Sequence, residues 1–100
     1  MTYGYLNEIS TQPGRRDEVV AILLGGVDGL LVAGCELYLV GVSDTEPDTV
    51  FVTEVWRSRA DHDASLQLPE TRAAIATAMP MLTGKFRTRA LTVAGGVGLP

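Results

Sequence analysis

The chain has 100 residues, of which eight are Lys or Arg and twelve are Asp or Glu, so its net charge is -4. This acidic balance excludes the basic surface with which nucleic-acid-binding proteins neutralise phosphates. One histidine and one cysteine cannot supply the three or four ligands of a usual zinc site, so we expect no metal. The length allows about one domain.

The N-terminal sequence MTYGYLNEIS lacks the basic start and the long apolar run of a signal peptide. No apolar run approaches the 18 or so residues of a membrane span. We therefore expect a cytoplasmic protein with no membrane partner.

Residues 3–11 alternate in the two-residue period of a strand, with Tyr3, Tyr5 and Ile9 on one face. Asn7 shares that face. Asparagine is a poor strand former that needs a partner when it is buried, so it interrupts an otherwise apolar surface.

A helix follows, with Asp17 and Glu18 in its early turns, where carboxylates suit the helix dipole. Its apolar residues recur at helical spacing and form one stripe: Val19, Ile22, Leu23, Val27 and Leu30. Three glycines, at 25, 26 and 29, weaken its second half by roughly 1 kcal/mol each relative to alanine.

Two strands, AGCELYLVGVS (33–43) and DTVFVTEVWRS (48–58), flank the turn-forming loop SDTEPD and predict a hairpin. Ser58 then caps a short helix, with Asp61 three residues later, and Pro69 is expected to end it. A second helical segment, ETRAAIATAM (70–79), stops near Pro80. The last strand is KFRTRALTVA (85–94).

The resulting β-α-β-β-α-β order predicts an α+β, ferredoxin-like domain over residues 1–94 with a four-stranded antiparallel sheet, followed by a loose tail at 95–100. Helices cover only one face of such a sheet. Residues 37–42 and 50–52 are almost continuously apolar, which indicates strands buried on both faces. A homodimer that packs two sheets together would cover the second face.

Four stretches resemble one family: QPGRRDEVVAIL, AGCELYLV, FVTEVWRSRADHDASLQLPETRAAI and GKFRTRALTV. Together they are similar to the antibiotic biosynthesis monooxygenases, small dimeric α+β barrel enzymes that include quinol and anthrone monooxygenases. The resemblance covers about residues 3–93. It implies a cofactor-independent oxidation of an electron-rich aromatic substrate by O2, because such a substrate can itself reduce oxygen once it is deprotonated.

The resemblance assigns catalytic roles to three residues. In similar proteins the indole at the position of Trp56 lines the cleft, where a flat substrate can stack on it. The alternative is an aromatic side chain of the hydrophobic core. His62 is a candidate base at a helix start, and the alternative is a solvent-exposed histidine. Asn7 is a candidate amide for a substrate oxygen, and the alternative is a strand-edge residue that meets water.

Tyr5, Tyr38 and Glu54 are expected to bind the substrate. Glu54 has a structural alternative, an ion pair across the sheet with Arg87 or Arg89.

Two other functions remain open. A non-catalytic dimer could bind or sense a small aromatic metabolite, since a fold does not determine a function. Haem binding is the other. Haem-degrading relatives look similar at Asn7 and Trp56, but they place the haem-ligating histidine about ten residues beyond the tryptophan. Leu66 stands there in this sequence, one helical turn after His62.

Overall fold

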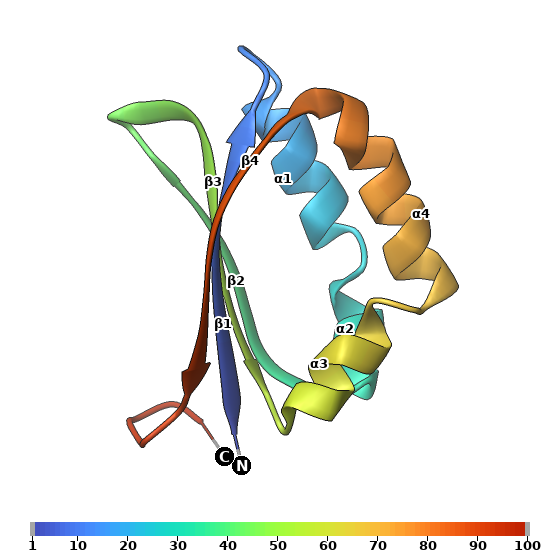
Figure 1. The fold of residues 1–100 in the computed structure, drawn as a ribbon, viewed down its shortest axis with the longest axis vertical. Helices are drawn as coiled ribbons and strands as arrows, with labels where there is room; N and C mark the ends of the chain where they lie inside the picture. Colours follow the sequence, from blue (N-terminus) through green and yellow to red (C-terminus); the bar gives the residue numbers. More distant parts are fainter. Residues whose placement is uncertain (1, 100) are drawn as a thin grey trace.

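The computed structural model describes residues 2–99, so Met1 and Pro100, the last residue of the predicted tail, lie outside the described residues. The elements run along the chain as β1 (Tyr3–Thr11), α1 (Arg16–Leu24), α2 (Val27–Val32), β2 (Cys35–Ser43), β3 (Glu46–Trp56), α3 (Arg59–Ser65), α4 (Pro69–Ala78), a 3-10 turn (Met79–Met81) and β4 (Leu82–Thr92). Figure 1 shows all four α-helices on one face of the sheet. The α+β, ferredoxin-like prediction is therefore confirmed.

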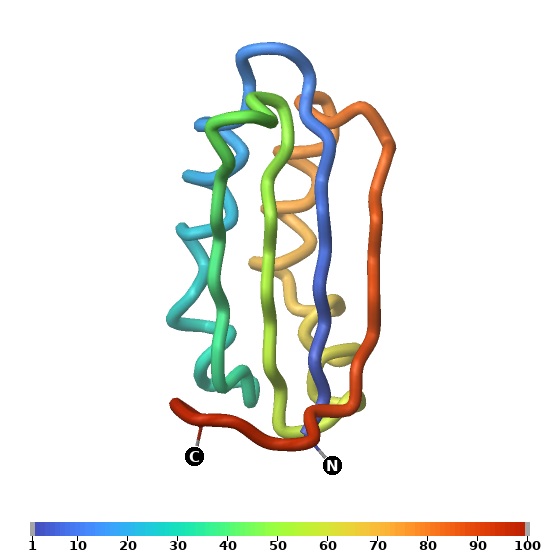
Figure 2. The backbone as a smooth tube through the Cα atoms, turned by 90° about the vertical axis from the view of Figure 1, so that its left-hand side faces the viewer, coloured from blue at the N-terminus to red at the C-terminus, as the bar shows by residue number. Residues whose placement is uncertain are grey.

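The four strands form one antiparallel sheet in the order β2-β3-β1-β4. Figure 2 shows these strands side by side, with the helices behind them and no element in front. The predicted hairpin is the β2–β3 pair. Within residues 2–99, none of the helices has the length and apolar character needed to cross a lipid bilayer.

Several element boundaries differ from the sequence prediction, including the start of β4, which lies at Leu82 and not at Lys85. The first helix breaks at Gly25 and Gly26 into α1 and α2, as expected where consecutive glycines lower helix stability. The short helix ends at Ser65, and Pro69 begins α4 instead of ending α3. Proline suits the first turn of a helix because the N–H group that it lacks would have no partner there. The third strand begins at Glu46, earlier than predicted.

Strand register decides which side chains meet the helices. Tyr5 in β1 lies opposite Glu54 in β3, and Glu54 lies opposite Tyr38 in β2. These three side chains therefore share the helix-covered face, because residues directly opposite each other in a ladder point the same way. The buried core on this face consists of Ile9, Val19, Val50 and Val52.

The start of β2 is tied to the start of α3 at Gly34. Its backbone oxygen accepts a hydrogen bond from Arg57 N at 3.1 Å. Its φ of 110° is one that L side chains rarely adopt, and a Cβ there would lie 2.6 Å from Asp61 Oδ2. Only glycine allows the ion pair of Arg57 and Asp61 to lie this close to the chain. The Ser58 Oγ accepts a hydrogen bond from Asp61 N, so the predicted N-cap is confirmed.

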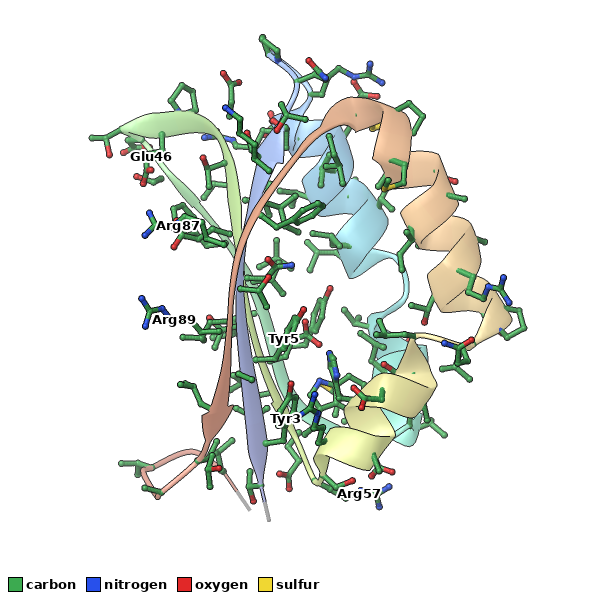
Figure 3. All side chains as sticks on the ribbon, viewed as in Figure 1. Tyr3, Tyr5, Glu46, Arg57, Arg87 and Arg89 are labelled. Atoms are coloured by element: carbon green, nitrogen blue, oxygen red, sulfur yellow. The ribbon has the colours of Figure 1, made fainter. Side chains whose placement is uncertain are left out.

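No helix or strand among residues 2–99 covers the other face of the sheet (Figure 2). Figure 3 shows Arg87 and Arg89 pointing away from the helices, while Tyr3 and Tyr5 point toward them. Leu39 is 58% exposed and Leu91 is 44% exposed. This face is the one for which a partner copy is expected.

Candidate functional site

A cavity of about 310 Å³ lies between the sheet and the helices. Apolar side chains of α1 and α4 supply much of its wall, and its polar lining consists mainly of Tyr5, Asn7, Tyr38, Glu54, His62 and Ser65. This volume is at the lower end of the range, roughly 300–1,000 Å³, of pockets that hold small molecules. Five of the six residues predicted from the sequence to form a site line this one cavity.

His62 is buried, with only 5% of its surface exposed, so the alternative of a solvent-exposed helix-start histidine is wrong. Its ring lies 4.5 Å from the ring of Tyr5 and 5.3 Å from that of Tyr3, measured between centroids. Its Nδ1 lies 3.0 Å from Asp63 Oδ1. A neutral imidazole that donates from Nδ1 to this carboxylate keeps Nε2 free as a proton acceptor.

Glu54 is the acidic residue that the sheet contributes to the cavity lining. The Trp56 indole Nε1 donates a hydrogen bond to Glu54 Oε1 at 2.9 Å. Burial raises the pKa of the Glu54 carboxyl, while the Trp56 hydrogen bond and the charge of His62 lower it by smaller amounts. A carboxylate of raised pKa in a largely apolar cavity is typical of binding and catalytic sites.

Trp56 does not occupy the position that the resemblance implies. Its side chain is fully buried, with 0% exposed, and it is not among the residues that line the cavity. It lies behind the cavity wall, hydrogen-bonded to Glu54 and edge-on to His62 at 5.6 Å between ring centroids. A substrate in this cavity would therefore contact Glu54 and His62, and no stacking on the indole follows from this geometry.

The two predicted tyrosines border the same cavity. Burial, together with the nearby Glu54 charge, raises the pKa of Tyr38, so its hydroxyl stays protonated at neutral pH and can donate a hydrogen bond. Tyr5 lies opposite Glu54 and packs against His62 with its ring tilted by 36°. Burial also raises the pKa of Tyr3, the second tyrosine beside the histidine.

Asn7 lines the cavity from β1, on the face predicted from strand alternation. Its Oδ1 accepts a hydrogen bond at 3.0 Å from the Thr88 hydroxyl on β4. This bond orients the amide so that its NH2 group is available to donate, since oxygen and nitrogen assignments follow from the hydrogen-bond network.

The alternative ion pair for Glu54 is wrong. Arg87 lies opposite Glu8 in the β1–β4 ladder, and Arg89 lies opposite Leu6, so both arginines are on the uncovered face. Glu54 is on the helix-covered face. The sheet therefore lies between the Glu54 carboxylate and the two arginine side chains.

Ser65 also lines the cavity, although no sequence pattern pointed to it. It is buried, and its hydroxyl donates to the His62 backbone oxygen at 2.6 Å, which closes the last turn of α3. Ser65 could have been predicted as a cavity residue because it follows His62 by three positions and so lies on the same helix face.

The arrangement offers proton acceptors and hydrogen-bond donors around an apolar space. His62 and Glu54 can accept protons, while Tyr38 and Asn7 can donate hydrogen bonds to a ligand oxygen. In residues 2–99 no three His, Cys, Asp or Glu side chains come together as a metal site would require. These groups are suited to proton transfer on a mainly apolar organic ligand.

The chain is similar to a known family in sequence and to solved structures in fold. The sequence model described as antibiotic biosynthesis monooxygenase matches residues 2–77. A search of curated proteins found no match. Solved structures do match: a candidate antibiotic biosynthesis monooxygenase from Chloroflexus aurantiacus is 33% identical, with 98% of this chain and 100% of that chain covered and a TM-score of 0.81.

Two more distant structures share the fold. One from Caulobacter crescentus is 21% identical, with 94% and 91% of the two chains covered and a TM-score of 0.85. One from Nitrosomonas europaea is 11% identical, with 97% and 94% covered and a TM-score of 0.87. Because the family's sequence model covers more than half of it, the chain belongs to the antibiotic biosynthesis monooxygenase family.

Proposed function

We propose that this protein is a cytoplasmic, cofactor-independent oxidoreductase, a monooxygenase that oxidises an electron-rich aromatic substrate such as a quinol or an anthrone with O2. The observation that carries this proposal is the apolar cavity of about 310 Å³ on which His62, Glu54, Tyr38 and Asn7 converge, in a chain of this family. The cavity can hold a small aromatic molecule away from water, where proton transfer and charge stabilisation are most effective.

The chemistry requires a proton acceptor and hydrogen-bond donors from the protein. His62 Nε2 removes a proton from the substrate, whose electron pair then stays on the ring system and reduces O2. For an anthrone, one oxygen atom becomes the new carbonyl and the other leaves as water with the two hydrogens of the oxidised carbon, so the substrate is the only reductant. Asn7 and Tyr38 hydrogen-bond the substrate oxygen on which negative charge develops.

Oxygen uptake tests the proposal. Protein treated with a chelator and freed of flavin should consume O2 faster than the buffer control with at least one member of a panel of quinols and anthrones. The control matters because these compounds oxidise slowly by themselves. Uptake at the buffer rate for the whole panel would overturn the monooxygenase proposal.

The burial of Trp56 favours a second candidate, a dimer that binds an aromatic metabolite without turnover. The resemblance implies that the indole meets the substrate, whereas here it lies behind Glu54 and His62. Saturable binding of a quinol or anthrone, measured by calorimetry, without oxygen uptake would select this candidate.

We also propose that the working unit is a homodimer that pairs the two uncovered sheet faces. This face carries exposed apolar residues, including Leu39, beside both signs of charge, with Glu8 opposite Arg87 in the ladder. Such a surface can complement itself across a two-fold axis, since each acid can meet a base of the partner copy.

The dimer predicts a particle with twice the 10.7 kDa chain mass in light scattering after gel filtration. Leu39→Glu places a charge on the sheet face and should shift the protein toward the monomer. Leu31→Glu is the matched control, because Leu31 is 69% exposed on α2, away from the sheet face. A monomeric wild-type protein at micromolar concentration would contradict the dimer.

A further inference from the structure

The charged residues around the cavity are acids. Glu54 and Glu70 both line it, and none of the eight lysines and arginines does. The cations near α3 have other partners: Arg57 lies 3.1 Å from Asp61 Oδ2, and Arg59 lies 3.7 Å from Asp63 Oδ2. His62 is the one basic side chain in the lining, and it already has the Asp63 carboxylate beside it.

An anionic ligand would therefore meet no free countercharge. A ligand carboxylate close to the ionised Glu54 would be repelled, because like charges interact strongly at the low effective dielectric constant of a partly buried site. The ligand carboxylate would also lose its hydration on entering a cavity lined mostly by apolar side chains.

A neutral hydroxyl group suits Glu54 better. The Trp56 indole occupies Oε1, and no hydrogen bond from residues 2–99 reaches Oε2. Because Glu54 lines the cavity, this second oxygen is available to a ligand. Hydrogen bonds to an ionised acceptor are shorter and stronger than those between neutral groups.

We propose that Glu54 sets the substrate class of the cavity: it accepts a hydrogen bond from the hydroxyl of an uncharged aromatic ligand and excludes analogues that carry a carboxylate. Trp56 is the positioning residue, because its N–H fixes the carboxylate with one oxygen toward the ring and the other toward the cavity. This inference rests on the proposed function in assuming an aromatic ligand, but it concerns binding and needs no turnover.

Other titratable groups line the cavity with Glu54: Tyr5 from β1, Tyr38 from β2, His62 from α3 and Glu70 from α4. Tyr3 in β1 and Cys35 in β2 are also close enough for the Glu54 charge to raise their pKa. The cavity residues of α1, α2 and β4 are not titratable. Because burial raises the pKa of Glu54, affinity for a hydroxyl donor should increase as the pH rises from about 4 through the titration of this carboxyl.

Calorimetric titration under argon tests the inference without interference from oxidation. The probes are a naphthohydroquinone, its dimethyl ether and its carboxylated analogue. At neutral pH the wild-type protein should bind the hydroquinone best and the carboxylated analogue least. Glu54→Gln keeps the size and the Trp56 hydrogen bond but removes the charge, so it should bind the hydroquinone about tenfold more weakly. It should bind the carboxylated analogue more tightly, leave the ether within twofold, and lose the pH dependence.

Glu70→Gln is the matched control, because it removes an equal charge from an exposed cavity residue on α4, whereas the Trp56 indole donates to Glu54. An equal effect of Glu70→Gln on binding would show that the total negative charge around the cavity selects the ligand. That result would overturn the assignment to Glu54. The assignment would also fail if Glu54→Gln bound all three probes as the wild type does, or if the wild type did not bind the hydroquinone.

Thermal unfolding shows whether the Glu54→Gln protein is folded and gives an independent measure of the charge. The folded state binds the Glu54 proton more tightly than the unfolded chain does, so wild-type stability falls as the pH rises through the raised pKa. Glu54→Gln should therefore melt at the wild-type temperature near pH 4 and at a higher temperature near pH 8. A lower temperature at both would contradict a buried, ionising carboxylate.

The two proposals can fail separately. The predicted binding pattern without oxygen uptake would keep the Glu54 assignment and remove the monooxygenase. Oxygen uptake that accepts carboxylated and neutral substrates equally, in wild type and Glu54→Gln alike, would keep the monooxygenase and remove the Glu54 assignment.

Discussion

Replacing His62 by phenylalanine should lower kcat for the best quinol or anthrone by roughly 10² to 10⁴, the range contributed by a general base. Phenylalanine keeps an aromatic ring beside Tyr5 and Tyr3, so the packing of the cavity wall changes little. It removes the proton acceptor. We expect KM to change much less than kcat, because the lost interaction belongs to the transition state.

Two further variants show whether the loss comes from proton transfer. Asp63→Asn keeps the histidine but weakens the acceptor of its Nδ1–H, so a smaller loss of kcat is expected. Asp17→Asn removes an equal charge from a fully exposed position in α1 and should have no effect. Steady-state oxygen uptake measures all three, and a kcat of His62→Phe within twofold of wild type would remove the histidine from the mechanism.

Replacing Trp56 by alanine should lower the free energy of unfolding by about 3–5 kcal/mol, the usual cost of truncating a large buried aromatic side chain. The indole is fully buried where β3 meets α3, and it also holds Glu54. Small domains are stable by only about 5–15 kcal/mol, so this change removes a large part of the total.

Trp56→Phe separates packing from the hydrogen bond. It retains most of the apolar contact and should cost much less than alanine, but it removes the donor that lowers the Glu54 pKa. The pKa of Glu54 should therefore rise further. Urea unfolding followed by circular dichroism measures stability without the lost tryptophan signal, with Val97→Ala, at a fully exposed position, as the control. A cost below about 1 kcal/mol for the alanine variant would show that the indole is not part of the core.

Much of the fold could be predicted because local patterns and long-range packing agree. Strand alternation placed Tyr3, Tyr5, Asn7 and Ile9 on one face, and the ladder puts that face under the helices. The Ser58 cap was readable because its hydrogen bond spans only three residues. The glycines predicted a weak second half of the first helix. The position of the break at Gly25 depends on how α1 and α2 pack against the rest of the domain.

The site was only partly predictable. The spacing of Glu54 and Trp56 places them on one strand face, yet the resemblance assigned the indole to the substrate, whereas it donates to Glu54 from behind the wall. His62 gave no sign of burial, since a polar residue beside Asp61 and Asp63 is ordinary for a helix start. Its burial comes from two tyrosines of β1, more than fifty residues away in the chain.

The sequence by itself determined the class of fold, the order of the elements and the face on which each strand residue lies, because periodicity and capping are local properties of the chain. Only the tertiary structure decided which polar groups surround the cavity. Strand register brings Tyr5, Glu54 and Tyr38 into one row, and α3 closes His62 over it. Burial and pKa depend on such distant neighbours, which no local pattern specifies.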